Sequence, residues 1–341
     1  MALSMAYLSA RASTARELQT TLYLTQLKTQ RNVHTAFRRL TDSLRHEVEN
    51  ATLRLVNAMY VRRSVSLRNR FVRKMRRFYK ARIKTFTFRQ LGGPEANINK
   101  WIQKRSRKKI KDFLPPESVN SQTLLMLMNA VFFRGSWLSP FNKKDTAKFS
   151  FRLNRVQSIS VEMMNVNANF RSKYSSTLGC RSLELPYAGD RFSLFVILPN
   201  RVENLQQLER QLTVHHLEDL LNITNQPVRL RVRIPKFKLE TSFRLKRALQ
   251  HLGIEEVFKT GSADLTGING KRRSLHVNDV AHKSCVEVDE GGTKGLSDQL
   301  PVKESVSKPP SFYVDRPFLF IIRDKIFRIN LLMGKIVEPS V

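Results

Sequence analysis

Uninterrupted apolar runs of strand length constrain the fold of this chain most strongly. SLFVIL at residues 193–198 and FLFII at 318–322 predict strands that are covered on both faces. VRLRVRI at 228–234 alternates instead, which predicts a half-exposed strand with arginines on its open face. A further strand is expected at 274–280. Large sheets with covering layers are therefore required.

Helical periodicity marks the other segments. Apolar residues recur at helical spacing in 33–45, 67–80 and 98–114, and Pro115-Pro116 would stop the last of these. Residues 242–258 also turn helical, and the opening MALSMAYLSARAS reads as part of an amphipathic helix whose beginning is absent. Together with the strands, these segments predict a mixed α/β (α+β) fold.

Composition and length place the chain among globular proteins. Of 341 residues, 41% are hydrophobic and 26% are charged, which disfavours disorder, collagen and coiled coil. The length alone leaves one large unit or two domains open. The longest apolar run, 124–133, is interrupted by Asn129 and is too short to span a bilayer, so no membrane insertion is expected.

The net charge is the most unusual feature of the composition. Sixty Lys and Arg against 28 Asp and Glu leave +32, a field that attracts glycosaminoglycan, nucleic acid or an acidic membrane face alike. Two predicted helices have exposed faces that carry only positive charge, which either a solvated surface that maintains solubility or a ligand site would explain. The candidate polyanion-binding residues are Arg70, Arg73, Lys74, Arg76, Arg77, Lys80, Lys104, Arg105, Lys108 and Lys109.

Cysteine and sequon usage bear on the compartment. Cys180 and Cys285 are too few for a disulfide framework and are expected to be buried free thiols. Asn50 and Asn222 begin N-x-[ST] tripeptides and are candidate glycosylation sites, which gives weak support to a secreted, extracellular protein. The first residues lack the basic start of a signal peptide, so none is visible in this chain.

No catalytic signature is present, and an enzyme is the disfavoured class. His46-Glu47 lacks the second histidine of a zincin, and no GxSxG, GxGxxG or Walker A spacing occurs. His215-His216 is more simply a helix-surface pair than a metal site, so neither a metal nor another cofactor is expected, apart from a possible glycosaminoglycan co-factor. Nucleic-acid-binding modules are also missing.

Residues 290–311 form a long connector with little pattern. The segment begins with Gly291-Gly292, ends with Pro309-Pro310 and has strands predicted on both sides. Connectors of this length inside a compact domain are usually functional loops or links. An exposed loop is favoured over an interdomain linker.

Five blocks of the chain resemble the serpin family in order and spacing. They are LLMLMNAVFFRGSWLSPF, LELPYAGDRFSLFVILP, RIPKFKLETSFRLKRALQHLGI, VAHKSCVEVDEGGT, and RPFLFIIRDK followed by LLMGKIVEP. INKWIQKRSRKKIKDFLPP also resembles the helix that crosses the family's main sheet, and the opening residues resemble the later part of an early core helix, so the first helix is expected to be missing.

The resemblance implies one serpin-like domain over residues 1–341, with three β-sheets, eight or nine helices and a reactive loop at 290–311. In inhibitory members a serine protease cleaves this loop and is trapped as an acyl-enzyme when the loop inserts into the main sheet. The resemblance thus implies a monomeric suicide substrate whose partner is a serine protease.

The resemblance also assigns parts of the loop. Glu290, Gly291, Gly292 and Thr293 match the hinge. The cleaved bond would join Val306 and Ser307, which suits an elastase-like protease, while Lys303 and Lys308 are rival residues for a trypsin-like one. Side chains at alternate positions of an inserted strand face the core; these would be Thr293, Gly295, Ser297 and Gln299.

Four residues beneath or beside the main sheet match positions that control its opening: Asn129, His282, Trp137 and Lys236. Asn129 and His282 match polar groups at the sheet centre, and Trp137 matches a tryptophan near the start of the loop. Lys236 would form an ion pair with Glu290. Ordinary buried polar residues, which need partners in any sheet, would give the same pattern.

Some departures from the family pattern count against inhibition. Gln299 is bulky for an inward position, and Pro301 cannot donate a ladder hydrogen bond in a central strand. Two functions therefore remain. The chain is either a secreted inhibitor whose basic surface binds a polyanion such as heparin, or a non-inhibitory serpin that binds or carries a polyanion or glycosaminoglycan.

Overall fold

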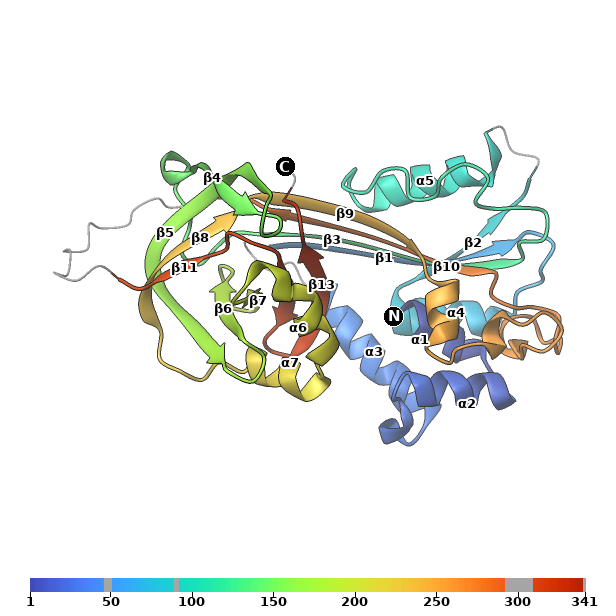
Figure 1. Ribbon diagram of the computed structural model, residues 1–341. Helices are drawn as coiled ribbons and strands as arrows, with labels where there is room; N and C mark the ends of the chain where they lie inside the picture. Colours follow the sequence, from blue (N-terminus) through green and yellow to red (C-terminus); the bar gives the residue numbers. More distant parts are fainter. Residues whose placement is uncertain (46–50, 89–91, 292–308, 340–341) are drawn as a thin grey trace. The chain divides into compact units, whose positions relative to one another are not determined.

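A computed structural model describes residues 1–45, 51–88, 92–291 and 309–339 (Figure 1). The chain separates into two compact units. Unit 1 comprises Met1–Glu47, Leu53–Phe133 and Glu240–Val286, and unit 2 comprises Val48–Thr52, Arg134–Leu239 and Glu287–Val341. Each unit is described by itself below.

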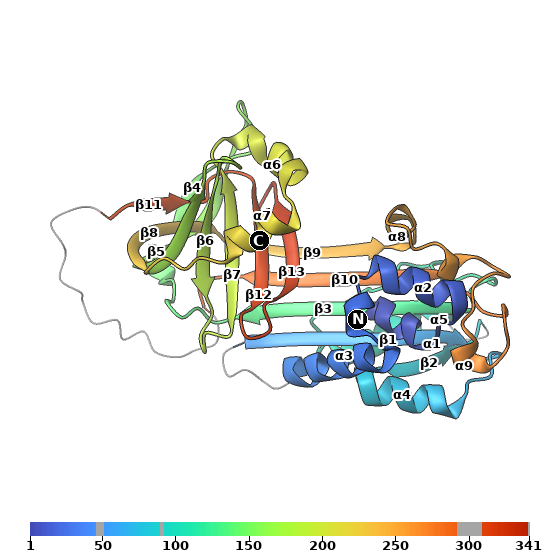
Figure 2. The same cartoon turned by 90° about the horizontal axis from the view of Figure 1, so that it is seen from below.

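A five-stranded sheet forms the centre of unit 1 (Figure 2). Its strand order is β2-β1-β3-β10-β9, and both β1 with β2 and β3 with β10 pair in parallel. The strands are β1 (Ala51–Arg62), β2 (Arg82–Phe86), β3 (Leu125–Gly135), β9 (Phe237–Arg244) and β10 (Asp279–Val288). β10 leads directly into the predicted reactive loop.

Helices cover both faces of this sheet. The helices of unit 1 are α1 (Ala2–Ser9), α2 (Ala12–Thr21), α3 (Gln30–Arg45), α4 (Asn69–Tyr79), α5 (Gly93–Arg105), α8 (Lys246–His251) and α9 (Thr266–Asn269). Leu125 and Leu127 of β3 join one apolar cluster with α1, α2, α3, α4, α8 and α9, whereas Met126 and Met128 join another with α5. Because successive strand residues face opposite ways, α5 lies across the sheet from α4 (Figure 1).

Unit 2 is mostly antiparallel sheet. Its strands are β4 (Ala147–Arg152), β5 (Ser158–Ser175), β6 (Cys180–Pro186), β7 (Phe192–Pro199), β8 (Val228–Pro235), β11 (Ser311–Tyr313), β12 (Phe318–Asp324) and β13 (Ile329–Ile336). β5 is 18 residues long. Its 163–170 stretch pairs with β8, and its 171–175 stretch pairs with β6. β5 therefore joins two parts of one eight-stranded sheet, whose order is β11-β8-β5-β6-β7-β12-β13 with β4 paired to β5.

The apolar runs at 193–198 and 318–322 account for much of the core of unit 2. Every residue of β7 is buried, and β12 is nearly so, because each pairs on both edges and is covered by α6 (Leu205–Gln211) and α7 (Val214–Leu221). β8 alternates as expected, with Leu230, Val232 and Ile234 buried and its arginines half-buried. A five-stranded sheet, an eight-stranded sheet and nine α-helices in the described ranges confirm the predicted α+β class.

The third predicted helix is shorter than expected. α5 ends at Arg105 rather than at residue 114, because Arg107 and Lys108 adopt positive φ values of 55° and 64°. The buried Ser106 hydroxyl accepts a hydrogen bond from the Ile110 N–H at 3.0 Å and fixes this turn. Ile110 and Phe113 are still buried, but they reach the core from a turn, so Lys108 and Lys109 do not lie on the helix.

Three other local predictions need correction. Residues 242–244 belong to β9, so the helical pattern of 242–258 is confined to α8 and a short 3-10 turn at Glu256–Phe258. The strand expected at 274–280 begins only at Asp279. α1 is not amphipathic, because Ser4–Ser9 are all buried. Its apolar residues join the same core cluster as those of α4. In each case burial or pairing overrides a local pattern.

Two further predictions concern the cysteines and membrane-spanning segments. Cys180 and Cys285 are both buried thiols, as expected, and burial raises the pKa of the Cys180 thiol to about 11. Within the described ranges, every helix falls short of the length and apolar character that a bilayer-crossing segment needs.

Candidate functional site

The end of β10 is tied down by an ion pair in unit 2. Glu290 is only 5% exposed, and its Oε1 lies 3.3 Å from Nζ of Lys236. The same oxygen accepts a hydrogen bond from the Thr146 hydroxyl at 2.8 Å, and Lys236 reaches a second carboxylate, Glu162, at 3.1 Å. We call Lys236, Glu290, Thr146 and Glu162 the hinge anchor.

The electrostatics of the hinge anchor favour both charges. Burial works against the carboxylate of Glu290, but hydrogen bonds from the backbone, Thr146 and Lys236 outweigh it and lower the pKa of Glu290. Burial likewise works against the Lys236 ammonium, but Glu162 and Glu290 outweigh it and raise its pKa. The pair therefore stays ionised at neutral pH and holds the hinge in place.

The neighbours of Glu290 are held as well. Nε1 of Trp137 donates a hydrogen bond to the Asp289 carbonyl at 2.7 Å, and the indole stacks on Tyr187 with ring centroids 4.5 Å apart. Arg134 lies 2.6 Å from the Asp289 carboxylate and 3.2 Å from the Gly291 carbonyl. Asp289, Glu290 and Gly291 are therefore each held by side chains of unit 2.

The sheet centre in unit 1 holds the second part of the site. Asn129 of β3 and His282 of β10 are register partners, and His282 Nδ1 lies 2.7 Å from Asn129 Oδ1. Asn129 Nδ2 donates to Asn57 of β1 at 2.7 Å. Burial lowers the pKa of His282, although the bond to Asn129 opposes this. One amide therefore bridges three adjacent strands.

Some of these residues were not predicted from the sequence. Arg134, Thr146, Glu162 and Asn57 come from four different strands or turns and carry no local motif. Only Arg134, three residues before Trp137, could have been suspected from its position in the matched block. The others become visible only when strand pairing brings them together.

The candidate polyanion-binding residues fall into two groups on opposite faces of the unit 1 sheet. Arg70, Arg73, Arg76, Arg77 and Lys80 are exposed on or just after α4, and Lys104, Arg105, Lys108 and Lys109 are exposed at or after the end of α5. Lys74 is half-buried, and its pKa is lowered by burial and by the nearby Arg70 and Arg11. Arg76, Lys80 and Arg105 line one cavity.

The rest of the loop lies outside the described residues. This applies to Gly292 and Thr293 of the hinge, to Val306 and Ser307 at the expected cleaved bond, and to Asn50. Asn222 is exposed directly after α7. In the described ranges no group of three or more His, Cys, Asp or Glu could hold a metal.

The comparisons identify the family. The model of the serpin (serine protease inhibitor) family matches residues 1–339, so the chain is a member of the serpin family.

Relatives and solved structures agree with this assignment. The chain is 31% identical over 345 residues to the leukocyte elastase inhibitor of Xenopus laevis, covering 99% of this chain and 90% of that protein. It is 32% identical to human Serpin B9, with the same coverage. The crystal structure of uncleaved ovalbumin matches with a TM-score of 0.87 at 27% identity, over 99% of this chain and 90% of that one. Several of these relatives are named leukocyte elastase inhibitors.

Proposed function

We propose that this serpin is a secreted serine protease inhibitor that acts as a suicide substrate, with its loop inserting as a strand into the unit 1 sheet. The supporting observation is the parallel β3–β10 pair, bridged by Asn129 and His282. A chain that turns back from β10 would run antiparallel to both strands. Insertion would break the parallel β3–β10 ladder and form two antiparallel ladders in its place. Antiparallel ladders are slightly more stable per residue than parallel ones.

The proposed target is an elastase-like protease. Val306 before the expected cleaved bond fits a small apolar primary pocket, and several relatives are named leukocyte elastase inhibitors. A trypsin-like protease would instead cut at Lys303 or Lys308. Mass spectrometry of the nicked chain identifies the bond.

A covalent complex tests inhibition directly. The protein is incubated with an elastase-like or a trypsin-like protease and run on a denaturing gel. We expect a band at the summed mass with the elastase-like enzyme. Complete cleavage without such a band would exclude the inhibitory function.

Two variants at neighbouring loop positions sharpen this test. By the expected alternation Thr293 faces the core after insertion, whereas Leu296 faces outward. Thr293→Arg would bury a charge and stall insertion, so we expect cleavage with at least about tenfold less complex. Leu296→Arg carries the same charge outward and should form complex as the parent does. Equal behaviour of both variants would contradict loop insertion.

Secretion and glycosylation are tested together. Exposure of Asn222 makes this sequon accessible to glycosylation, which supports an extracellular protein. Protein recovered from the medium of expressing cells should lose mass with an N-glycosidase. Retention inside the cell without glycan would contradict this part of the proposal.

The basic residues on and directly after α4 and α5 are proposed to bind a polyanion such as heparin. Their charge is not balanced within the chain, whose net charge is +32, and such binding weakens steeply with salt. We expect retention on a heparin column well above physiological ionic strength. Elution below it would exclude a physiological polyanion site.

A second candidate function is a non-inhibitory serpin that binds or carries a polyanion. Gln299 and Pro301 favour it, because a bulky inward side chain and a missing N–H both hinder insertion. Cleavage without complex, combined with firm heparin retention, is the result that would select this function.

A further inference from the structure

Among the described residues, one edge of β1 has no strand beside it along part of its length. β1 runs over Ala51–Arg62, but β2, at the margin of the sheet, pairs only from Ala58 onward. The β2 side of residues 53–57 therefore has no strand beside it within the described part of the chain. We call this stretch the free edge.

Main-chain groups of the free edge point outward. The Arg62 N–H donates toward β3, to the Leu124 carbonyl at 2.8 Å, and the Arg63 N–H donates toward β2, to the Phe86 carbonyl at 2.9 Å. Main-chain groups alternate sides along a strand. Leu53 and Leu55, like Arg63, therefore present N–H and C=O groups on the β2 side, where a further strand could pair with them.

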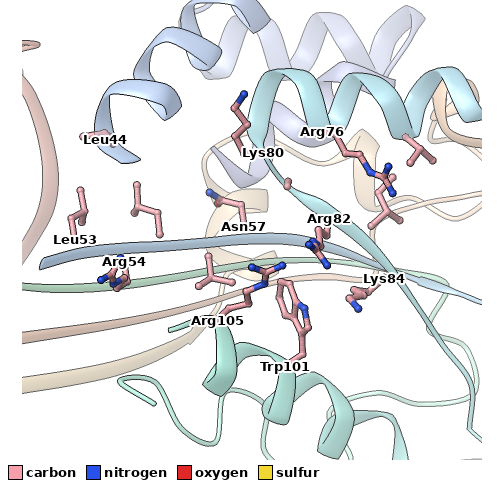
Figure 3. Close-up of a pocket in the computed structure, with 15 residues that line it drawn as sticks. Leu44, Leu53, Arg54, Asn57, Arg76, Lys80, Arg82, Lys84, Trp101 and Arg105 are labelled. Atoms are coloured by element: carbon pink, nitrogen blue, oxygen red, sulfur yellow. The ribbon is translucent and has the colours of Figure 1, made fainter. Parts of the chain in front are cut away.

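A cavity of about 760 Å³ lies at the free edge (Figure 3). It is lined by residues 53–57 together with Leu44 of α3, Trp101 of α5, and residues from the end of α4 and the start of β2. The close-up shows α4 on one side of the strand and α5 on the other (Figure 3). The described side chains therefore leave space beside the free edge.

Cations line this cavity on both faces of the sheet. Arg76 and Lys80 come from the α4 side, Arg105 comes from the α5 side, and Arg82 and Lys84 belong to β2 (Figure 3). Lys84 and Arg105 flank the Trp101 ring at 5.9 Å and 6.0 Å. No Asp or Glu is among the lining residues.

Little within the described chain neutralises these cations. Lys80 has a carboxylate partner, Asp42, at 3.3 Å. In the described ranges Arg76, Arg82 and Arg105 form no ion pair, and Arg76 and Arg105 approach one cavity from opposite faces. Their mutual repulsion would be relieved by an anion placed between them.

We propose that the free edge binds an acidic peptide segment in an extended conformation, added as a strand beside residues 53–57. Side chains of a strand alternate between the two faces, so successive carboxylates would meet Arg76 or Lys80 on one face and Arg105 on the other. Main-chain pairing with Leu53 and Leu55 would supply the rest of the affinity. The free edge spans about 13 Å, which four or five peptide residues cover.

This binding mode differs from that of a sulfated glycan. A glycan supplies anions but no alternating N–H and C=O groups, so it would use the cations and not the free edge. The inference is independent of protease inhibition, because it involves neither the loop nor the hinge anchor.

The first experiment compares two fluorescent probes, a hexaglutamate peptide and the same peptide with alternate amides N-methylated. Both probes have the same charge, but the second cannot pair as a strand. Fluorescence anisotropy with the whole chain should show at least about tenfold weaker binding of the methylated probe. Equal binding of both probes would overturn the proposal and leave only a nonspecific basic surface.

The second experiment uses matched variants on one helix. Arg76 lines the cavity, whereas Arg73, also exposed on α4, does not. Arg76→Glu should weaken hexaglutamate binding about tenfold more than Arg73→Glu does. Equal effects would contradict a defined site, because they would mean that only the overall charge matters.

A third variant separates peptide from glycan. Leu55→Pro removes one outward N–H and leaves every cation in place, and edge strands tolerate proline. It should weaken hexaglutamate binding and leave heparin retention unchanged. Loss of both, with a circular dichroism spectrum like that of the parent, would overturn strand addition. If the variant fails to fold, the methylated probe already decides the question.

Discussion

His34 illustrates how a single buried residue can set a condition on stability. It is 2% exposed, and its Nδ1 lies 2.6 Å from the Tyr79 hydroxyl, which itself donates to the Ser4 carbonyl at 3.0 Å. Nε2 has no hydrogen-bond partner within the described residues. Burial, with repulsion from Lys74 and Arg11, lowers the pKa of His34 to about 4. Protonation would therefore place an unsatisfied charged donor in the core.

The lowered pKa of His34 makes the free energy of unfolding depend on pH between pH 6.5 and about pH 4. The unfolded chain binds a proton to His34 near pH 6.5, but the folded protein binds it only near pH 4. Stability should therefore fall as the pH drops through this range, by up to about 3 kcal/mol. Urea unfolding at pH 7 and pH 4.5 should show a larger loss for the parent than for His34→Gln. The same loss in both proteins would contradict the assignment to His34.

Close contacts between elements depend on residues that local patterns do not single out. α9 packs against the end of α1 at Gly267, where an added Cβ would lie 2.6 Å from the Cα and the carbonyl oxygen of Ser9. At Gly291 an added Cβ would meet none of the described atoms within 4 Å. Close packing therefore requires a glycine at position 267 but not at position 291.

We expect Gly267→Ala to separate α9 from α1. Overpacking against backbone typically costs about 1–3 kcal/mol, whereas Gly291→Ala should change stability by less than about 0.5 kcal/mol. Chemical denaturation of the two variants measures the difference. A Gly267→Ala variant as stable as the parent would mean that the two helices can move apart freely.

Lys283 connects β10 to the segment that follows α5. It is 6% exposed, lies 2.7 Å from the Glu240 carboxylate of β9, and donates to the Lys111 carbonyl at 2.7 Å. A strand inserting beside β10 would have to leave this connection intact or displace it. The buried lysine therefore couples the sheet to the chain segment across its face.

Lys283→Met should loosen that segment. We expect a loss of about 1–3 kcal/mol. The more exposed Lys335, paired with Glu209 at 2.9 Å, should lose under about 1 kcal/mol as Lys335→Met. Hydrogen exchange at residues 106–114 should rise in the first variant only. Unchanged exchange there would show that Lys283 does not hold this segment.

At the scale of the whole molecule, the proposed function requires a native state that is not the most stable one. Strand insertion would add on the order of ten main-chain hydrogen bonds at about 1 kcal/mol each. The folded, uncut chain keeps β3 and β10 paired and the hinge anchored by Lys236 and Glu290. Cleavage of the loop would free the segment to insert.

The nicked protein should therefore melt higher than the intact one. For a chain of this length the added ladder corresponds to a rise in Tm of roughly 10 °C or more. Calorimetry before and after limited proteolysis measures it, with nicked Thr293→Arg as the control that should show no rise. If the nicked parent also melts no higher, insertion does not occur.

Much of the secondary structure was predictable because it depends on local periodicity. The apolar runs at 193–198 and 318–322 became β7 and β12, and the stripe of 67–80 became α4. The ends of elements were less predictable. α5 stops at Arg105 because a buried serine and two left-handed residues intervene, and periodicity does not report on these.

The order of the apolar and alternating segments determined the fold class, because burial of side chains at a period of two or 3.6 residues is a local property of the chain. The serpin family was indicated by the resemblance of five sequence blocks. Only the tertiary structure decided which distant residues meet. It brought Thr146, Glu162 and Lys236 to Glu290, and it divided the basic residues between two faces of one sheet. The physical reason is that such contacts depend on strand pairing and register over long sequence separations, which periodicity does not encode.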